Sequence, residues 1–298
     1  LTSNWDEFSD EYSGLDYYEY SVGTGGGNSS GTSLSFDGID DYVDLGRPNS
    51  LDFFPRQDSF SIMGYIKMNS HGTIYSFGAS SDISDTQIKL VVRSDNYGIE
   101  VTIGGQVSYS NTPINDNNWH HIALTVPNSI SGIKLYIDGT PEEFVSGGGN
   151  VGDVKSEENG NIGARTNGTG YFLDGIIDNL SIWDTELSLN QIQSYMNTEL
   201  AGNEQNLVSY WNFNEGTGTT LTDLSSNGNH GTIHGASWIE DAPILSADGL
   251  GSDILSWTNN SDRESFVVGG MELENGVTYY TNVRAVDEVG NISDVLTS

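Results

Sequence analysis

The feature that most constrains this chain is an alternation of apolar and polar residues with a period of two, which recurs along most of its length. In residues 60–68, FSIMGYIKM, the side chains of Phe60, Ile62 and Ile66 fall on one side of an extended backbone. Residues 133–139, IKLYIDG, repeat the pattern. Glycine-rich and Asp-Gly segments separate such runs at the spacing of hairpins. The alternation predicts half-buried strands, and therefore an all-β fold of the sandwich or barrel type.

One segment departs from this period and predicts a helix. Residues 187–200, LSLNQIQSYMNTEL, place Leu189, Ile192 and Met196 at the spacing of one helix face. Ser188 precedes them, and serine is favoured at the N-cap of a helix. We therefore expect one short helix that lies across a β-structure.

The charge of the chain restricts its partners. It carries 42 acidic and 10 basic side chains, which gives a formal net charge of -32. Such a charge repels the phosphates of nucleic acids and anionic lipid headgroups, so we expect no nucleic acid partner. An acidic surface suits contact with divalent cations, although it also serves solubility alone.

Two absences in the sequence bear on stability and location. No stretch approaches the roughly 18 consecutive apolar residues that a membrane span requires, so we expect no membrane insertion. The chain has no cysteine, so its stability has to come from the size of the core or from a bound metal. Because the chain starts at Leu1, we expect it to be a segment of a longer chain with neighbouring domains.

Five ordered motifs in residues 31–245 carry a resemblance to a known family. They are SLSFDGIDDYVDLG, DSFSIMGYIKM, NWHHIALTVPNSISGIKLYIDGT, NIGARTNGTGYFLDGIIDNLSIWDTELSLNQI and LVSYWNFNEGTGTTLTDLSSNGNHGTIHGASW. Together they resemble the laminin-G-like, concanavalin-A-like jelly-roll modules, and the resemblance implies a jelly-roll sandwich for residues 31–245. Two features depart from the family pattern. Tyr65 stands where the family usually has Trp, and the EGTG segment follows FDG instead of preceding it, which predicts that EGTG pairs beside SLSFDG.

The two ends of the chain resemble the halves of one other module. Residues 1–27 resemble the first half of a fibronectin type III-like domain, and residues 247–298 resemble its second half. The resemblance implies a split host domain, with the jelly roll inserted in one of its loops. Insertion requires that the termini of the inserted module lie close together. The alternative is that the two ends are halves of separate neighbouring domains.

Two carboxylates fall on strand faces that should be buried. In GIIDNLSIW, alternation places Asp178 on the same side as Leu180 and Ile182, and Asp41 shares a side with Val43. A buried carboxylate requires hydrogen bonds, a counter-charge or a metal. The family resemblance places these two acids close together.

Calcium is the metal that this chemistry favours. It takes six to eight oxygen ligands, and a glycine turn such as FDGIDD supplies both carboxylates and carbonyls. We predict a calcium ion held by Asp37, the carbonyl of Gly38, Asp41 and Asp178, as modules of this resemblance often have. The alternative is that Asp37 and Asp178 accept hydrogen bonds from neighbouring backbone. Five histidines and no cysteine offer no adequate ligand set for zinc.

No catalytic motif is recognisable. The sequence contains no run of the E-x-D-x-E type, which jelly-roll glucanases use, no G-x-S-x-G and no phosphate-binding loop with its lysine. We therefore expect that the chain is not an enzyme.

Ligand binding is the remaining function. The loop ARTNGTGYF, residues 164–172, offers Arg165, Asn167 and Tyr171, and these types suit sugars because Arg and Asn pair with hydroxyls while a Tyr ring stacks on C–H faces. An ordinary hairpin loop is the alternative. We expect a calcium-dependent, glycan-binding module of an extracellular cell-surface adhesin, whose partner is a cell-surface glycan or an extracellular polysaccharide. A protein-binding or spacer module, and an accessory module of a polysaccharide-degrading enzyme, are the rival interpretations.

Overall fold

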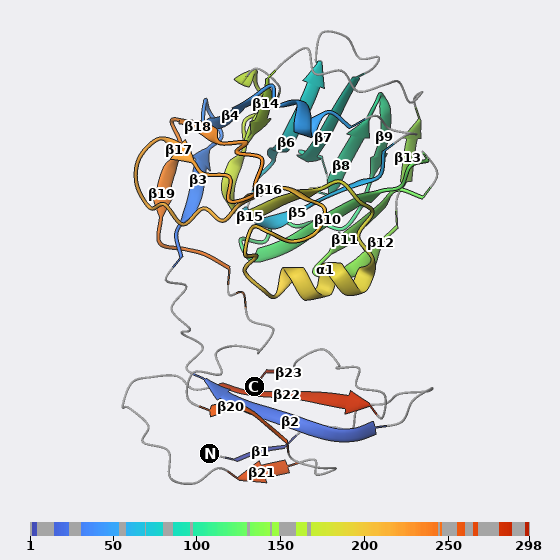
Figure 1. The fold of residues 1–298 in the computed structure, drawn as a ribbon, viewed down its shortest axis with the longest axis vertical. Coiled ribbons are helices and arrows are strands. Elements are labelled where there is room, and N and C mark those ends of the chain that lie inside the picture. The colour runs from blue at the N-terminus through green and yellow to red at the C-terminus, as the bar shows by residue number, and fades with distance from the viewer. Residues whose placement is uncertain are drawn as a thin grey trace. The chain divides into compact units, whose positions relative to one another are not determined.

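The chain forms two compact units (Figure 1). The central unit is Gly31–Pro243, and the end unit combines Leu1–Ser30 with Ile244–Ser298. A computed structural model describes residues 2–4, 15–23, 31–53, 58–68, 70–79, 86–95, 98–129, 132–143, 145–148, 159–165, 168–243, 245, 255–259, 265–267, 280–287 and 296–297.

The central unit is an all-β sandwich of two antiparallel sheets, as the alternation in the sequence predicts. The first sheet has, in order, β12 (Thr140–Glu142), β11 (Lys134–Ile137), β10 (Trp119–Val126), β5 (Phe60–Met68), β15 (Asp174–Trp183), β3 (Ser33–Asp37) and β19 (Ser237–Ile239), while β16 (Leu207–Trp211) also pairs with β15. The second sheet has β13 (Val145–Gly148), β9 (Gln106–Tyr109), β8 (Ile99–Ile103), β7 (Thr86–Val92), β6 (Gly72–Ala79), β14 (Gly160–Ile162), β4 (Tyr42–Gly46), β18 (Gly231–His234) and β17 (Thr220–Leu221). A short 3-10 turn, η1 (Asn49–Leu51), follows β4.

The inner faces of the two sheets form one apolar core. Phe60 and Ile62 of β5 and Ile88 and Leu90 of β7 belong to it, and all are at most 2% exposed. Full burial of side chains of this size stabilises the fold by about 1.5–3 kcal/mol each. Trp211 reaches the same core and donates its indole N–H to the Asn229 carbonyl at 3.0 Å. The core therefore follows directly from the alternating strands.

A second apolar cluster lies on the outer face of the first sheet, beneath the helix α1 (Leu189–Met196) (Figure 1). Ser188 caps this helix in a capping box with Gln191, so the predicted helix is confirmed, although it is shorter than residues 187–200. Ile192 of the helix is fully buried, and the rings of Trp183 and Tyr195 stack with centroids 4.7 Å apart. The helix thus covers part of one sheet.

The two ends of the central unit meet at the edge of the first sheet. Strand β19 pairs with β3, with Ile239 opposite Ser33 and Ser237 opposite Ser35. The Ser33 hydroxyl contacts the Asp241 carbonyl at 2.6 Å, just beyond β19. The segment beside SLSFD is therefore β19, and the expectation that EGTG pairs there is wrong.

The end unit joins strands from both ends of the chain. Strand β2 (Leu15–Gly23) lies between β20 (Leu255–Asn259) and β22 (Tyr280–Asp287), and β23 (Leu296–Thr297) extends this sheet. A separate pair links β1 (Thr2–Asn4) to β21 (Ser265–Val267). The fibronectin type III assignment and the insertion stay predictions. Within the described residues, no helix has the length and apolar character needed to cross a membrane.

Candidate functional site

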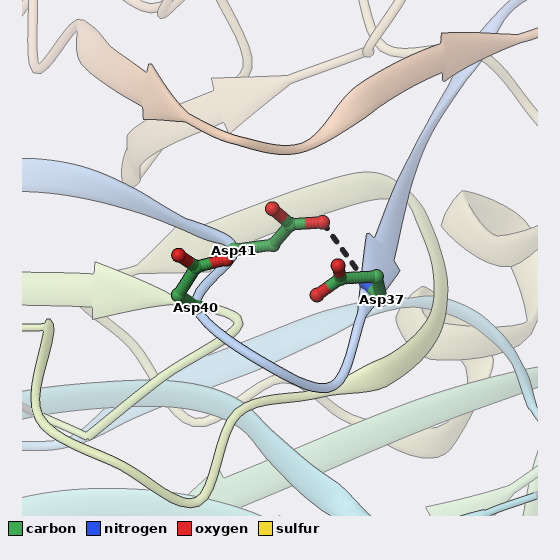
Figure 2. Close-up of side chains that lie close together, drawn as sticks. All are labelled: Asp37, Asp40 and Asp41. Carbon is green, nitrogen blue, oxygen red and sulfur yellow. Dashed lines mark hydrogen bonds between the residues drawn. The ribbon is translucent and has the colours of Figure 1, made fainter.

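Three carboxylates converge at the turn between β3 and β4. Asp37 ends β3, and Asp40 and Asp41 directly precede β4. One carboxylate oxygen from each residue lies within 4.8 Å of the other two (Figure 2). Asp41 is buried, whereas Asp37 and Asp40 are exposed. Within the described residues, no other group of three acidic or histidine side chains brings its ligand atoms this close together.

Hydrogen bonds fix two of these carboxylates in the turn. The backbone N–H of Asp37 donates to Asp41 Oδ2 at 2.9 Å, and the N–H of Ile39 donates to Asp37 Oδ1 at 2.8 Å. Burial raises the pKa of Asp41, and the neighbouring charges of Asp37 and Asp40 raise it further, against the hydrogen bond from Asp37. The turn therefore concentrates negative charge that a cation would neutralise.

Two glycines hold this turn against its neighbours. Gly38 has a φ of 78°, and a Cβ built on it would lie 2.9 Å from the Asp174 Cβ. Gly235 has a φ of 76°, and a Cβ there would collide with Asp41 Oδ1. These positions therefore require glycine both for the left-handed backbone and for the close approach. Asp41 is buried because the Gly235 backbone lies directly against it.

The loop that follows β14 carries the second part of the site. The Arg165 guanidinium lies 4.6 Å from the centroid of the Tyr171 ring, and His71 meets the same ring edge-on at 5.7 Å. Tyr171 is 37% exposed, so this ring remains accessible at the surface. The structure thus brings Arg165 and Tyr171 together. Asn167, the third residue of the predicted set, lies outside the described residues.

Tyr42 connects the loop to the acidic turn. A Cβ on Gly168 would lie 2.6 Å from the Tyr42 ring, so the loop packs directly on this side chain. The Tyr42 ring also stacks on His234, with centroids 4.5 Å apart. On the other side of the turn, Asp174 pairs with Asp37. The Asp174 N–H donates to the His71 carbonyl at 3.4 Å. The turn Asp37–Tyr42, the residues Arg165 and Gly168–Tyr171, and His71 therefore form one continuous surface, which we call the rim.

Comparison with known proteins agrees with this architecture. Residues 37–193 match the family described as the concanavalin A-like lectin/glucanases superfamily. The chain belongs to this superfamily. The match begins at the first acid of the turn and includes the whole loop that carries Tyr171.

The curated relatives that this chain matches are much longer proteins. The chain is 28% identical over 171 residues to the sushi, von Willebrand factor type A, EGF and pentraxin domain-containing protein 1 of Rattus norvegicus, and 28% identical over 134 residues to that of Mus musculus. The aligned parts are 53% and 42% of this chain but 4% of each relative. The match therefore spans a small fraction of the curated relatives.

A solved structure shares the fold. It is the crystal structure of "a putative carbohydrate binding protein from Bacteroides ovatus ATCC 8483", with a TM-score of 0.56 and 20% sequence identity. The similarity covers 72% of this chain and 61% of that one. At this identity the likeness concerns the fold of the superfamily member, not its ligand.

The structure does not bring Asp178 to the rim. Register pairs Asp37 with Asp174, four residues before Asp178 on β15, and Asp178 pairs instead with Tyr65 of β5. A bulge follows Asp178, where Asn179 has a φ of 50°. The bulge adds one residue, so Asp178 lies on the outer face of the first sheet and does not share the core face of Leu180 and Ile182. The predicted ligand set thus loses Asp178.

Asp178 instead has a hydrogen-bonded environment of its own. It is 1% exposed, its Oδ2 lies 2.9 Å from the Ser33 hydroxyl, and its Oδ1 accepts the Asn179 N–H at 2.7 Å. Burial raises its pKa to about 8, and the charge of Glu199 adds to this, whereas the two hydrogen bonds lower it. The alternative of a carboxyl held by neighbouring groups therefore describes Asp178.

The sequence did not point to several residues that form or support the rim. Asp40 completes the acidic cluster, His71 contacts Tyr171, and the pair of Tyr42 and His234 supports the loop. The doubled DD at 40–41 was a usable signal for Asp40. His71, just before β6, and His234, the last residue of β18, are far from the loop in sequence, so only the fold could reveal them.

Proposed function

We propose that the central unit is a calcium-dependent, glycan-binding module of an extracellular cell-surface adhesin, and that the rim is its ligand site. The observation that carries the proposal is the single surface that joins a cluster of three carboxylates to an accessible Tyr171 ring backed by Arg165. The superfamily and the fold shared with a carbohydrate-binding protein support a binding role in preference to catalysis.

The residues present fit a calcium ion. Asp37, Asp40 and Asp41 offer carboxylate oxygens within 4.8 Å of one another, and Gly38 places a backbone carbonyl in the same turn. Oxygen donors of these two types, without nitrogen or sulfur, are the set that calcium prefers. The cation would supply positive charge and coordination positions for sugar hydroxyls. Tyr171 would bind the C–H face of a sugar, and Arg165 would orient its ring.

The calcium part is tested by calorimetric titration and by thermal melting with calcium or chelator. Calcium that binds only the folded state raises the melting temperature. Asp41→Asn is expected to abolish most of the shift, while the matched control Glu143→Gln, an exposed acid elsewhere, leaves it intact. An unchanged melting curve with and without chelator would remove calcium from the proposal.

The ligand part is tested on a glycan array with the full chain. Tyr171→Ala is expected to lose binding, whereas Tyr171→Phe keeps the ring and most of the affinity. Chelator should abolish the same signals if the cation and the ring serve one ligand. An array without any signal in calcium-loaded protein contradicts glycan binding.

A protein-binding role is the second candidate, and one observation favours it. Ile39, at the tip of the acidic turn, is 71% exposed. An exposed aliphatic side chain suits a protein contact better than a sugar hydroxyl. This candidate would be selected if the chain bound a protein partner, if Ile39→Ser abolished that binding, and if the glycan array gave no signal.

A further inference from the structure

Two adjacent histidines on β10 have opposite surroundings. His120 lies near the surface, with Nδ1 at 2.8 Å from Asp138 Oδ2 and Nε2 at 3.1 Å from Asp116 Oδ1. His121 points to the other face and is 1% exposed. Both of its ring nitrogens are buried, and neither has a hydrogen-bond partner within the described residues. A neutral imidazole already loses hydrogen bonds there, and a protonated one would add an unpaired buried charge.

The titratable groups around His121 come from β5, from β15 and from the turn after β11. From β5, the Tyr65 ring meets the imidazole edge-on at 5.0 Å, and Asp178 lies opposite Tyr65 on the next strand. From the turn after β11, Asp138 Oδ1 accepts the backbone N–H of His121 at 2.8 Å. Helix α1 meets this group through Tyr65, and it has no charged residue and one titratable group, Tyr195. Among the described residues, Asp138 is the carboxylate that contacts His121, through the backbone N–H, and its other oxygen pairs with His120.

Helix α1 rests on these same groups. The Tyr65 hydroxyl donates to the Met196 carbonyl at 2.6 Å, at the C-terminal end of the helix. Gln193 Nε2 donates to the Gly139 carbonyl at 3.4 Å, and a Cβ on Gly139 would lie 3.1 Å from Met196 Sδ. Tyr65 therefore links the two sites, because its ring packs on His121 and its hydroxyl holds the end of the helix.

We propose that helix α1 is an acid-releasable cover, in which protonation of His121 detaches the helix from the outer face of the first sheet. The helix is the element that yields because it has eight residues and depends on its docked face for stability. The strands of the first sheet stay in place, because their backbone hydrogen bonds and their packing in the inner core do not involve the helix. Release exposes the apolar cluster around Trp183, Leu187 and Ile192.

The direction and the pH range follow from burial. Burial lowers the pKa of His121 from 6.5 to about 4, while Asp138 acts weakly in the opposite direction. A lowered pKa means that the neutral imidazole stabilises the closed state above pH 6.5, and that this stability is lost as the pH falls towards 4. Between pH 7 and pH 5, the equilibrium constant for opening rises by about 20-fold.

Hydrogen exchange of the full chain, measured by mass spectrometry and corrected for the intrinsic pH dependence of exchange, tests the proposal. For peptides that cover α1, the opening equilibrium constant obtained from exchange is expected to rise by about 20-fold from pH 7 to pH 5. Peptides from β16 should stay protected. His121→Phe keeps an aromatic ring and removes the charge, so it should abolish the change, whereas the neighbouring His120→Asn should retain it.

Two results would overturn the proposal. One is wild-type α1 that remains equally protected down to pH 4.5, and the other is His121→Phe that opens with acid as the wild type does. If His121→Phe does not fold, an NMR titration of the wild-type imidazole decides the question. Titration of His121 without a simultaneous change in the α1 amide signals contradicts the cover, and a simultaneous change supports it.

Discussion

The buried carboxyl of Asp178 gives the sharpest test of these electrostatics, through the substitution Asp178→Asn. Ser33 has one hydroxyl hydrogen but contacts both Asp178 Oδ2 at 2.9 Å and the Asp241 carbonyl at 2.6 Å. A protonated Asp178 resolves this conflict, because its O–H donates to Ser33 while Ser33 donates to Asp241. An asparagine amide reproduces that donor without a titratable proton.

The magnitude follows from the raised pKa. The pKa of Asp178 moves from 3.8 to about 8 on folding, so the unfolded chain loses this proton first as the pH rises. The free energy of unfolding therefore falls with pH between these two values, and at pH 7 the accumulated cost is about 4 kcal/mol. Asp178→Asn removes this cost. We expect the variant to be more stable than the wild type at pH 7 by up to that amount, with the difference shrinking towards pH 4.

Urea unfolding of both proteins at several pH values between 4 and 8 measures the difference. Asp174→Asn, which removes an exposed acid on the same strand, is the matched control for the loss of one carboxylate outside the buried site. A difference between Asp178→Asn and the wild type that stays constant over this range would refute the reasoning. So would a variant that is several kcal/mol less stable than the wild type at pH 7.

Three further predictions concern other parts of the central unit. Asp223→Ala leaves the buried N–H groups of Tyr210 and Asn229 without their acceptor, so the free energy of unfolding should fall by about 3 kcal/mol, as urea titration would show. His120→Asn removes an imidazole whose pKa the Asp138 hydrogen bond raises, so it should cost less than about 1 kcal/mol below pH 6.5, and the loss should vanish as the pH rises past the folded pKa. Gly235→Ala displaces the Asp41 carboxylate and should lower the melting temperature, and it should weaken the calcium binding that we propose for this turn, as calorimetry would measure.

The regular parts of the fold could be predicted because their patterns are local. The alternation in 60–68 became β5, and Ser188 caps the helix that the apolar spacing predicted. The turn FDGIDD gathers its acids because they are neighbours in sequence. For these elements, a few adjacent residues contain all the information.

The errors come from features that no short pattern reports. Alternation placed Asp178 on the core face, but the bulge at Asn179 shifts the strand by one residue and reverses its side. Asparagine can adopt the left-handed conformation that this kind of bulge uses, but an asparagine within a strand pattern is not enough to predict a bulge. The partner of β3 was equally hidden, because the choice between EGTG and β19 depends on strand pairing across about 200 residues.

The pairing of β3 with β19 has a consequence for how this module can be reused. Neighbouring antiparallel strands lie about 4.8 Å apart. Because Ser33 and Ile239 are paired, the two points where the module would join another chain are as close together as the two strands of a hairpin. A recipient protein would therefore have to accommodate only the width of a tight turn. The module could therefore be inserted by genetic engineering into a surface loop of an unrelated protein without distorting the backbone of either.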